Sequence, residues 1–323
     1  MSAFVFRCVL FCTLFLFEAV PALACTAEHK SILMVHSQLG LPYEGFSTPF
    51  IHEVKKTHKK LQIDHINLEN HEKHLVRSLI KTDYTNICAV VAVGTIALRA
   101  VRDQKILPST LPVIFGVVTD PVGEKVIEGF NVKPKGRFTG VSFSIDIKER
   151  LRFMRQTFPD AKNIGVIYST MPQSLSYKKW LVNLEHDLEF KDLNFIYRRV
   201  GMITKQDGPY KMIKRAERPI LALKDQVDLF ISPSDQMGIL PQFAQAVVKL
   251  TNKPVFGLAQ KDVEIEMGAV ASAYPDIKNS AIIAAKMMTG ILKGKAVSNY
   301  PPQRPRAVNL INKKTAKAFK IKG

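Results

Sequence analysis

The sequence lacks the motifs that mark the common classes of enzyme. It contains no Gly-x-Ser-x-Gly elbow, no Walker-type phosphate loop, and no Gly-x-Gly-x-x-Gly after its first expected strand. His71 and His74 have a spacing that can place two metal ligands on one helix face, but no cysteine or carboxylate cluster completes a site. We therefore expect solvent-facing histidines, no metal or cofactor, and a protein that is not an enzyme.

Long apolar segments and long polar tracts are also missing from most of the chain. Hydrophobic residues make up 46% and charged residues 23% of 323 residues, which is typical of a globular protein with a sizeable core, in two domains. After the first 24 residues no segment is apolar for long enough to span a bilayer. The net charge is +18, but the basic residues are scattered and form no basic stripe with interleaved aromatic residues. We expect a solvated basic surface and no nucleic-acid partner.

The first 24 residues have the pattern of an export signal. Arg7 precedes an apolar run from Cys8 to Phe17, and Ala22-Leu23-Ala24 supplies small residues at the two positions that a signal peptidase reads. The run is too short to span a bilayer comfortably. We predict cleavage after Ala24 and a location in the periplasm, or otherwise outside the cytoplasmic membrane.

Cleavage there would make Cys25 the first residue, which is where bacterial lipoproteins are acylated. The segment resembles a lipoprotein signal imperfectly, because Ala22 stands where such signals usually carry Leu. Only Cys25 and Cys88 would remain in the mature chain, and they could also form a disulfide. Soluble and lipid-anchored forms, with Cys25 as the candidate site of lipidation, are both open.

Short apolar runs alternate with amphipathic segments through the rest of the chain. In the first half the pattern predicts strands over 31–35, 61–66, 89–93 and 111–118, and helices over 45–59, 72–82 and 95–102. In the second half it predicts strands over 163–168, 194–200, 228–231 and 254–257, and helices over 174–188, 210–224 and 239–250. A strand over 269–273, a helix over 277–293, a Pro-rich crossing over 295–306, a strand over 307–310 and a helix over 313–319 follow. Continuous apolar strands alternating with helices indicate an α/β fold with two doubly wound lobes, each on a parallel sheet.

Ligands of open parallel sheets bind beyond the carboxyl ends of the strands, and polar residues gather there in this sequence. The polar strand ends are His36-Ser37-Gln38, Gly94-Thr95, Thr119-Asp120-Pro121, Ser142, Ser169-Thr170 and Ser232-Pro233-Ser234-Asp235. Gly94-Thr95 has the form of a helix start, whose free amides suit a carboxylate or serve only as a plain cap. Asp235 can pair with a ligand ammonium or cap the following helix. Thr119-Asp120-Pro121 with Gly123 has the residues of a tight turn.

Several of these segments resemble, in order, the signatures of one family. They are FGVVTDPV at 115–122, TGVS at 139–142, IGVIYS at 164–169, PSDQ at 233–236, KPVFG at 253–257 and INKKTAK at 311–317. The family is that of the ABC-transporter substrate-binding proteins, which includes tryptophan- and tyrosine-binding lipoproteins. The resemblance implies a type I periplasmic-binding fold, in which two α/β lobes joined by three crossings close on a small solute, often an aromatic amino acid.

The resemblance also implies lobe boundaries and a site. After the signal peptide, residues 1–24, lobe 1 would comprise residues 25–140 and about 274–296, and lobe 2 residues 141–273 and about 297–323. Carried over by position, the residues lining the cleft would be Gly94, Thr95, Thr119, Asp120, Ser142, Ser169 and Asp235. Thr95 and neighbouring amides would take the ligand carboxylate, and Asp235 its ammonium. The chain departs from the family at Ser169 and Gln236, where Asn is usual, so the ligand is open.

The leading hypothesis is an exported, monomeric solute-binding protein. It would capture an amino acid or a similar small molecule and present it to the membrane-bound permease subunits of an ABC importer. A ligand-sensing subunit of an envelope signalling receptor is the alternative. An envelope hydrolase is a third hypothesis, which the absence of a nucleophile motif disfavours.

Overall fold

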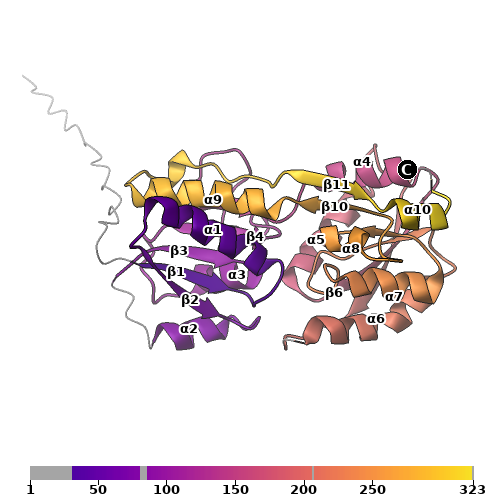
Figure 1. Ribbon diagram of the computed structural model, residues 1–323, viewed down its shortest axis with the longest axis horizontal. Coiled ribbons are helices and arrows are strands. Elements are labelled where there is room, and N and C mark those ends of the chain that lie inside the picture. Colours follow the sequence, from indigo (N-terminus) through magenta and orange to yellow (C-terminus); the bar gives the residue numbers. More distant parts are fainter. Residues whose placement is uncertain (1–30, 81–85, 206, 322–323) are drawn as a thin grey trace, which may run out of the picture.

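Two separate sheets organise the computed structural model, which describes residues 31–80, 86–205 and 207–321. Each sheet carries helices and forms one α/β lobe, and the two lobes lie end to end along the long axis (Figure 1). The predicted signal peptide and Cys25 lie outside the described residues. The predicted fold class is confirmed by this arrangement.

Lobe 1 is built on a five-stranded parallel sheet in the order β2-β1-β3-β4-β5. Its strands are β1 (Ser31–His36), β2 (Gln62–Asn67), β3 (Ile87–Val93), β4 (Val113–Val118) and β5 (Phe138–Ser142). Its helices are α1 (Tyr43–Thr57), α2 (Lys73–Leu79), α3 (Thr95–Asp103) and the late helix α9 (Ile277–Leu292), which packs against α1. Alternate residues of β1 join different cores: Ile32 packs on one face of the sheet and Leu33 on the other. The continuous apolar strands therefore do reflect burial on both faces.

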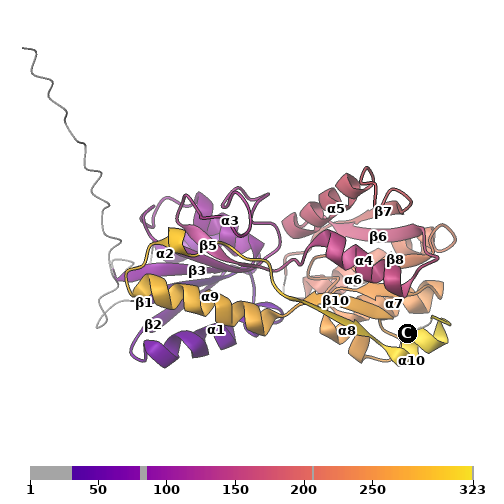
Figure 2. The same cartoon turned by 90° about the horizontal axis from the view of Figure 1, so that it is seen from above.

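Lobe 2 is built on a six-stranded sheet in the order β11-β10-β9-β8-β6-β7. Its strands are β6 (Asn163–Ser169), β7 (Asn194–Val200), β8 (Leu229–Ile231), β9 (Val255–Gly257), β10 (Ala271–Pro275) and β11 (Ala307–Ile311). Its helices are α4 (Ile147–Thr157), α5 (Pro172–Leu184), α6 (Gly208–Leu223), α7 (Pro241–Thr251), α8 (Gln260–Glu264) and α10 (Lys313–Ala318). The sequence pattern predicts a parallel sheet, but this sheet is mixed, because β11 runs antiparallel to β10. The chain reaches β11 directly from lobe 1 and not through a crossover helix on this sheet (Figure 2).

Helix α4 is the main element that the hydrophobic pattern does not reveal. Charged residues dominate its sequence, IKERLRFMRQT, and one of them, Arg150, is buried. Asp146 starts the helix by accepting a hydrogen bond from the Lys148 amide at 2.9 Å. Inside the lobe, Arg150 donates to the Tyr177 hydroxyl at 2.9 Å and to the Gly257 carbonyl at 2.6 Å. Its burial depends on these partners, which come from distant parts of the sequence.

Within the described ranges the chain passes between the lobes three times, after β5, after β10 and before β11. Strand β5 extends the first sheet to Ser142, and β10 extends the second to Pro275, so the boundaries expected at 140 and 273 fall inside strands. The third segment stays on lobe 1 as far as Gln303, whose amide donates to the Gly140 carbonyl at 2.9 Å. The crossings therefore adjoin the carboxyl ends of both sheets, where the predicted site residues lie.

Candidate functional site

One small pocket lies between the lobes at the carboxyl ends of their strands, with a cavity volume of about 30 Å³. We call it the interlobe pocket. From lobe 1 it is lined by Pro42, Tyr43, Thr95, Val117 and Thr119, from the first crossing by Phe143, and from lobe 2 by Gln173, Ser234, Asp235, Gln236 and Ile239. Of the predicted residues, the structure thus brings Thr95, Thr119 and Asp235 together across the two lobes.

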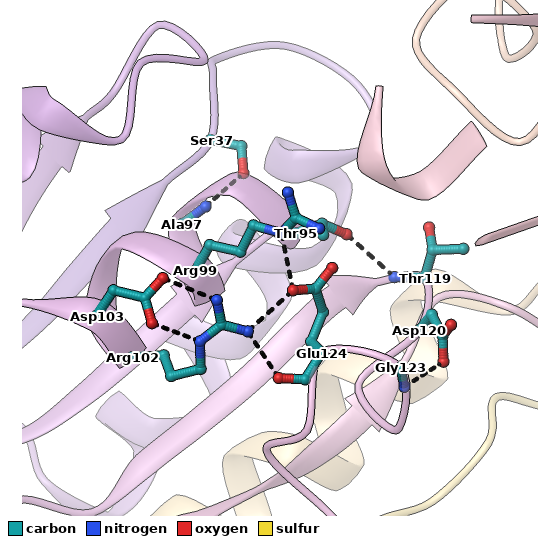
Figure 3. Close-up of polar contacts among 10 residues, drawn as sticks. All are labelled: Ser37, Thr95, Ala97, Arg99, Arg102, Asp103, Thr119, Asp120, Gly123 and Glu124. Atoms are coloured by element: carbon teal, nitrogen blue, oxygen red, sulfur yellow. Dashed lines mark hydrogen bonds and ion pairs between the residues drawn. The ribbon is translucent and has the colours of Figure 1, made fainter. Parts of the chain in front are cut away.

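The N-terminus of α3 forms the polar part of the lobe 1 wall. Gly94 precedes it with φ of +100°, and a Cβ at this position would lie 2.4 Å from the Ser37 hydroxyl oxygen. That hydroxyl accepts a hydrogen bond from the Ala97 amide at 3.0 Å, and the Thr95 hydroxyl accepts from the Thr119 amide at 3.4 Å (Figure 3). Gly94 therefore shapes the wall through its backbone without lining the pocket, and Thr95 and Thr119 present their side chains together.

Within the Thr119-Asp120-Pro121 segment, Asp120 stabilises a turn and Thr119 lines the interlobe pocket. The Asp120 carboxylate turns back to accept the Gly123 amide at 2.8 Å, and a Cβ on Gly123 would collide with it (Figure 3). Asp120 lies outside the pocket lining, whereas Thr119 is part of it. The tight-turn interpretation accounts for Asp120, and Thr119 is the residue of this segment that lines the pocket.

Asp235 supplies the acidic group of the lobe 2 wall and is 4% exposed. Its Oδ1 accepts the amides of Met237 at 3.0 Å and Gly238 at 3.1 Å, so it caps its own turn ahead of α7. Its Oδ2 makes no hydrogen bond of good geometry among the described residues, although the hydroxyls of Ser169 and Ser174 lie close enough to act on the carboxyl. Burial raises the pKa of Asp235, although the hydroxyl of Ser169, the Gly238 amide and other nearby donors act in the opposite direction. A buried carboxylate with one free oxygen is suited to a cationic partner.

Gln173, which the sequence patterns do not single out, adds a second free acceptor to the same wall. It lies in the first turn of α5, and its Oε1 is buried without a partner in the described part of the chain. Both Gln173 and Asp235 line the interlobe pocket. Two unpartnered oxygens on one wall match an ammonium group, which has three donors and no acceptor.

Ser142 and Ser169 lie beside the site and outside the lining. The Ser142 hydroxyl donates to the Ser144 carbonyl at 3.2 Å, within the first crossing. The Ser169 hydroxyl accepts the Met171 amide at 3.2 Å and acts on the site through the pKa of Asp235. The structure therefore places these two predicted residues in supporting positions.

The apolar walls come from residues that strand-end reasoning does not reach. Tyr43 and Pro42 belong to the turn and first residues of α1, and Phe143 directly follows β5. Burial is the main cause that raises the pKa of Tyr43 to about 12. The only signal in the sequence is that each of these residues lies within a few positions of a polar strand end, which does not say where a ring will point.

Direct hydrogen bonds join the lobes around the pocket. Gln236 Nε2 donates to Asn70 Oδ1 at 3.0 Å and to the Tyr43 hydroxyl at 3.1 Å. Asn70 Nδ2 in turn donates to Gln236 Oε1 at 3.3 Å. Away from the interlobe pocket, the Thr204 hydroxyl of lobe 2 lies 3.2 Å from His71 Nε2 of lobe 1. The structure is therefore a closed arrangement of the two lobes.

The histidines do not form a metal site in the part of the chain that the structure describes. His71 is exposed, and its ring centroid lies 5.1 Å from that of His74. No group of three or more potential metal ligands occurs in the described ranges.

No helix in the described ranges combines the length and the apolar character needed to cross a membrane.

Residues 31–198, just over half of the chain, match the family model described as ABC transporter substrate binding protein. The chain belongs to this family. The chain is similar to the tyrosine-binding protein of Clostridioides difficile (strain R20291). The two are 26% identical over 303 residues, which cover 83% of this chain and 84% of the relative.

Solved structures related to this ABC transporter substrate-binding protein share its fold. One is the ABC domain from Streptococcus pneumoniae in complex with L-Trp, with a TM-score of 0.73 and 20% identity, covering 91% of this chain and 96% of that one. A ligand-free, open substrate binding protein with adhesive properties from Clostridium difficile has a TM-score of 0.67 and 18% identity, with the same coverage. A conserved domain protein from Vibrio cholerae has a TM-score of 0.73 and 19% identity, again with the same coverage. At these identities the likeness shows the fold, and it confirms the predicted two-lobed, type I periplasmic-binding architecture.

Proposed function

We propose that this substrate-binding protein captures an amino acid, with an aromatic one as the leading candidate, and delivers it to an ABC importer. The observation that carries the proposal is that Thr95 and Thr119 of lobe 1 and Asp235 of lobe 2 line one pocket. The amides at the N-terminus of α3 and the two hydroxyls suit the ligand carboxylate. The free oxygens of Asp235 and Gln173 suit its ammonium. Two relatives whose names mention tyrosine and L-Trp support an aromatic side chain.

The walls between these polar ends are suited to an apolar side chain. Tyr43, Val117 and Phe143 are buried and line the interlobe pocket. An amino acid held by its carboxylate on lobe 1 and its ammonium on lobe 2 contacts both lobes only when they are closed. Binding would therefore shift the lobe equilibrium toward the closed form, which the permease subunits would recognise.

Calorimetry with the twenty amino acids tests the ligand class, and Asp235→Asn tests the ammonium site. We expect the wild type to bind an aromatic amino acid and Asp235→Asn to bind it at least about tenfold more weakly, because a hydrogen bond to a charged group is lost. The exposed Asp225, changed to Asn, is the matched control. Equal binding by Asp235→Asn would show that the ammonium lies elsewhere. Binding of 3-(4-hydroxyphenyl)propionate as tight as that of tyrosine would show the same without any mutation.

The transport role is tested by the protein's partners. Genes for a permease and an ATPase beside its own gene would support import. A histidine kinase or cyclase gene in that place would instead support the sensing alternative. Binding of the purified protein to permease-containing vesicles, stronger with ligand than without, is the direct measurement.

Export and anchoring are tested at the N-terminus. We propose cleavage after Ala24, which leaves Cys25 and Cys88 as the cysteines of the mature chain. Cys88 is disulfide-bonded. A thiol held in a disulfide cannot carry a thioether-linked lipid, so a bond between Cys25 and Cys88 would exclude lipidation at Cys25. The intact mass of the mature protein before and after reduction distinguishes a two-hydrogen gain from the mass of an attached lipid.

A further inference from the structure

A larger hollow adjoins the interlobe pocket on the side of the crossing segments. We call it the hinge-side groove, and its cavity volume is about 400 Å³. The residues that give it an apolar lining are Leu41, Phe143, Ile239, Leu258, Tyr274 and Val308. Pro42, Phe143 and Ile239 line both the groove and the interlobe pocket, so the two spaces share one wall.

The groove depends on closure of the lobes. Leu41 and Ile277 belong to lobe 1, Ile239 and Leu258 to lobe 2, and Tyr274 to the end of β10 at the second crossing. Movement of one lobe away from the other separates these walls. The groove is therefore completed by the same motion that completes the interlobe pocket, and an occupant would enter along with the ligand.

Apolar surface predominates in both spaces, but the polar groups suited to a zwitterion line only one of them. The groups that would hold a zwitterion, Thr95, Thr119 and Asp235, line only the smaller interlobe pocket. The groove exposes more apolar than polar surface, and its residue Leu41 is 52% exposed. An apolar group lying across Leu41 would remove that side chain from water, which is favourable.

Two basic residues stand at the mouth of the groove. Lys261 and Lys278 are exposed, and neither pairs with an acidic side chain within the described ranges. The neighbouring Asp276 is already engaged, because it accepts the Asn279 amide at 3.0 Å and pairs with Arg306 at 2.7 Å. The mouth therefore favours a neutral or anionic end and disfavours a cationic one.

We propose that the ligand is an amino acid whose apolar side chain is longer than that of tyrosine or tryptophan. Its zwitterionic head occupies the interlobe pocket, and its side chain passes Pro42, Phe143 and Ile239 into the hinge-side groove. The far end, neutral or anionic, lies near Lys261 and Lys278. This inference rests on the proposed capture of an amino acid and adds the length and polarity of its side chain.

Calorimetry with L-tyrosine and O-benzyl-L-tyrosine tests the proposal, because the two compounds share a head and differ only in reach. We expect the wild type to bind O-benzyl-L-tyrosine at least tenfold more tightly. Val308→Trp narrows the groove from the partly exposed strand β11, and Leu41→Ser makes its exposed rim polar. Both variants should lose this advantage while binding L-tyrosine within about twofold of the wild type. Asn309→Trp, on the next, exposed residue of β11 and outside the groove lining, should behave as the wild type.

The outcomes separate this inference from the function on which it rests. Binding of L-tyrosine with equal or weaker binding of O-benzyl-L-tyrosine would overturn the groove assignment alone. An advantage that survives in both Val308→Trp and Leu41→Ser would overturn it as well. Failure of the wild type to bind these two compounds and all twenty amino acids would overturn the proposed function, and the groove assignment with it. Leu41→Ser changes an exposed side chain, so the test stands even where Val308→Trp fails to fold.

Discussion

Asn70 and Gln236, which belong to different lobes, exchange two hydrogen bonds between their side-chain amides. The donor-to-acceptor distances are 3.0 Å from Gln236 Nε2 and 3.3 Å from Asn70 Nδ2. Gln236 directly follows Asp235 and lines the interlobe pocket, so closure of the lobes and the proposed ammonium site share one loop. These contacts stabilise the closed arrangement through the protein's own side chains.

Removing this pair should open the ligand-free protein. Gln236 makes three hydrogen bonds across the lobes, and each neutral bond contributes about 0.5–1.5 kcal/mol, so Gln236→Ala should lower the ratio of closed to open molecules by roughly ten- to two-thousandfold. Asn70→Gly should act in the same direction, and glycine suits the φ of +61° at this position. Small-angle scattering measures the change as an increased radius of gyration. Gln226→Ala is the control, because Gln226 donates within lobe 2 to the Ala222 carbonyl. A radius of gyration unchanged in both lobe-contact variants would contradict the prediction.

Gly94→Ala should destabilise the protein and weaken ligand binding together. The left-handed φ of +100° costs a non-glycine residue about 1–2 kcal/mol, and the added Cβ would also meet Ser37 and Tyr43. Relief of that clash must displace the start of α3, which carries Thr95. Gly136→Ala is the matched control, since nothing lies within 4 Å of a Cβ there. Thermal unfolding measures the change in stability, and calorimetry measures the change in ligand affinity. A Gly94→Ala variant as stable as Gly136→Ala would show that the backbone at Gly94 does not constrain the lobe 1 wall of the pocket.

Glu124→Gln should loosen the loop that carries Thr119. The buried Glu124 carboxylate accepts from Arg99 Nε at 2.7 Å and from Arg102 Nη1 at 3.0 Å, which joins this loop to α3 (Figure 3). Both arginines are about one-third exposed, so we expect a loss of about 1–3 kcal/mol in the free energy of unfolding. Urea denaturation measures this loss. Asp103→Asn changes the more exposed partner of Arg102 and should cost less. A larger loss in Asp103→Asn would place the stabilisation outside the loop.

Asp262 should make stability fall as pH rises toward neutrality. Burial raises its pKa to about 6, against the opposing effects of the Ala259 and Leu258 amides and the Arg150 charge. The folded protein thus holds this proton more tightly than the unfolded chain, where the pKa is near 3.8. The resulting stabilisation is complete below pH 3.8 and is lost as pH rises through about 6. An asparagine at this position cannot titrate, so the Asp262→Asn variant does not lose this stabilisation. Relative to the wild type, its free energy of unfolding should rise by up to about 3 kcal/mol between pH 4 and pH 7. Urea denaturation across this range tests the sign, and the opposite trend would mean that Arg150 dominates.

Most strands and helices could be predicted because their signal is local; strand β5 and helices α4 and α8 are exceptions. In β1 all six residues are buried, and the four central residues of SILMVH are apolar. Helix α4 could not be predicted in this way, because the buried Arg150 interrupts its apolar stripe. Its partners Tyr177, Gly257 and Ala273 lie far away in the sequence and become neighbours only in the folded lobe.

The candidate site divides along the same line. The sequence alone determined that polar residues end the strands, that Thr95 starts a helix, and that Asp120 has the chemistry of a turn. Only the tertiary structure decided that Thr95, Thr119 and Asp235 share a pocket while Asp120, Ser142 and Ser169 support it from outside. It also decided that Tyr43, Phe143 and Gln173 complete the walls. The reason is physical: strand ends are set by hydrophobic periodicity within one segment, whereas the direction of a side chain across a cleft depends on how two lobes, each folded on its own sheet, come together.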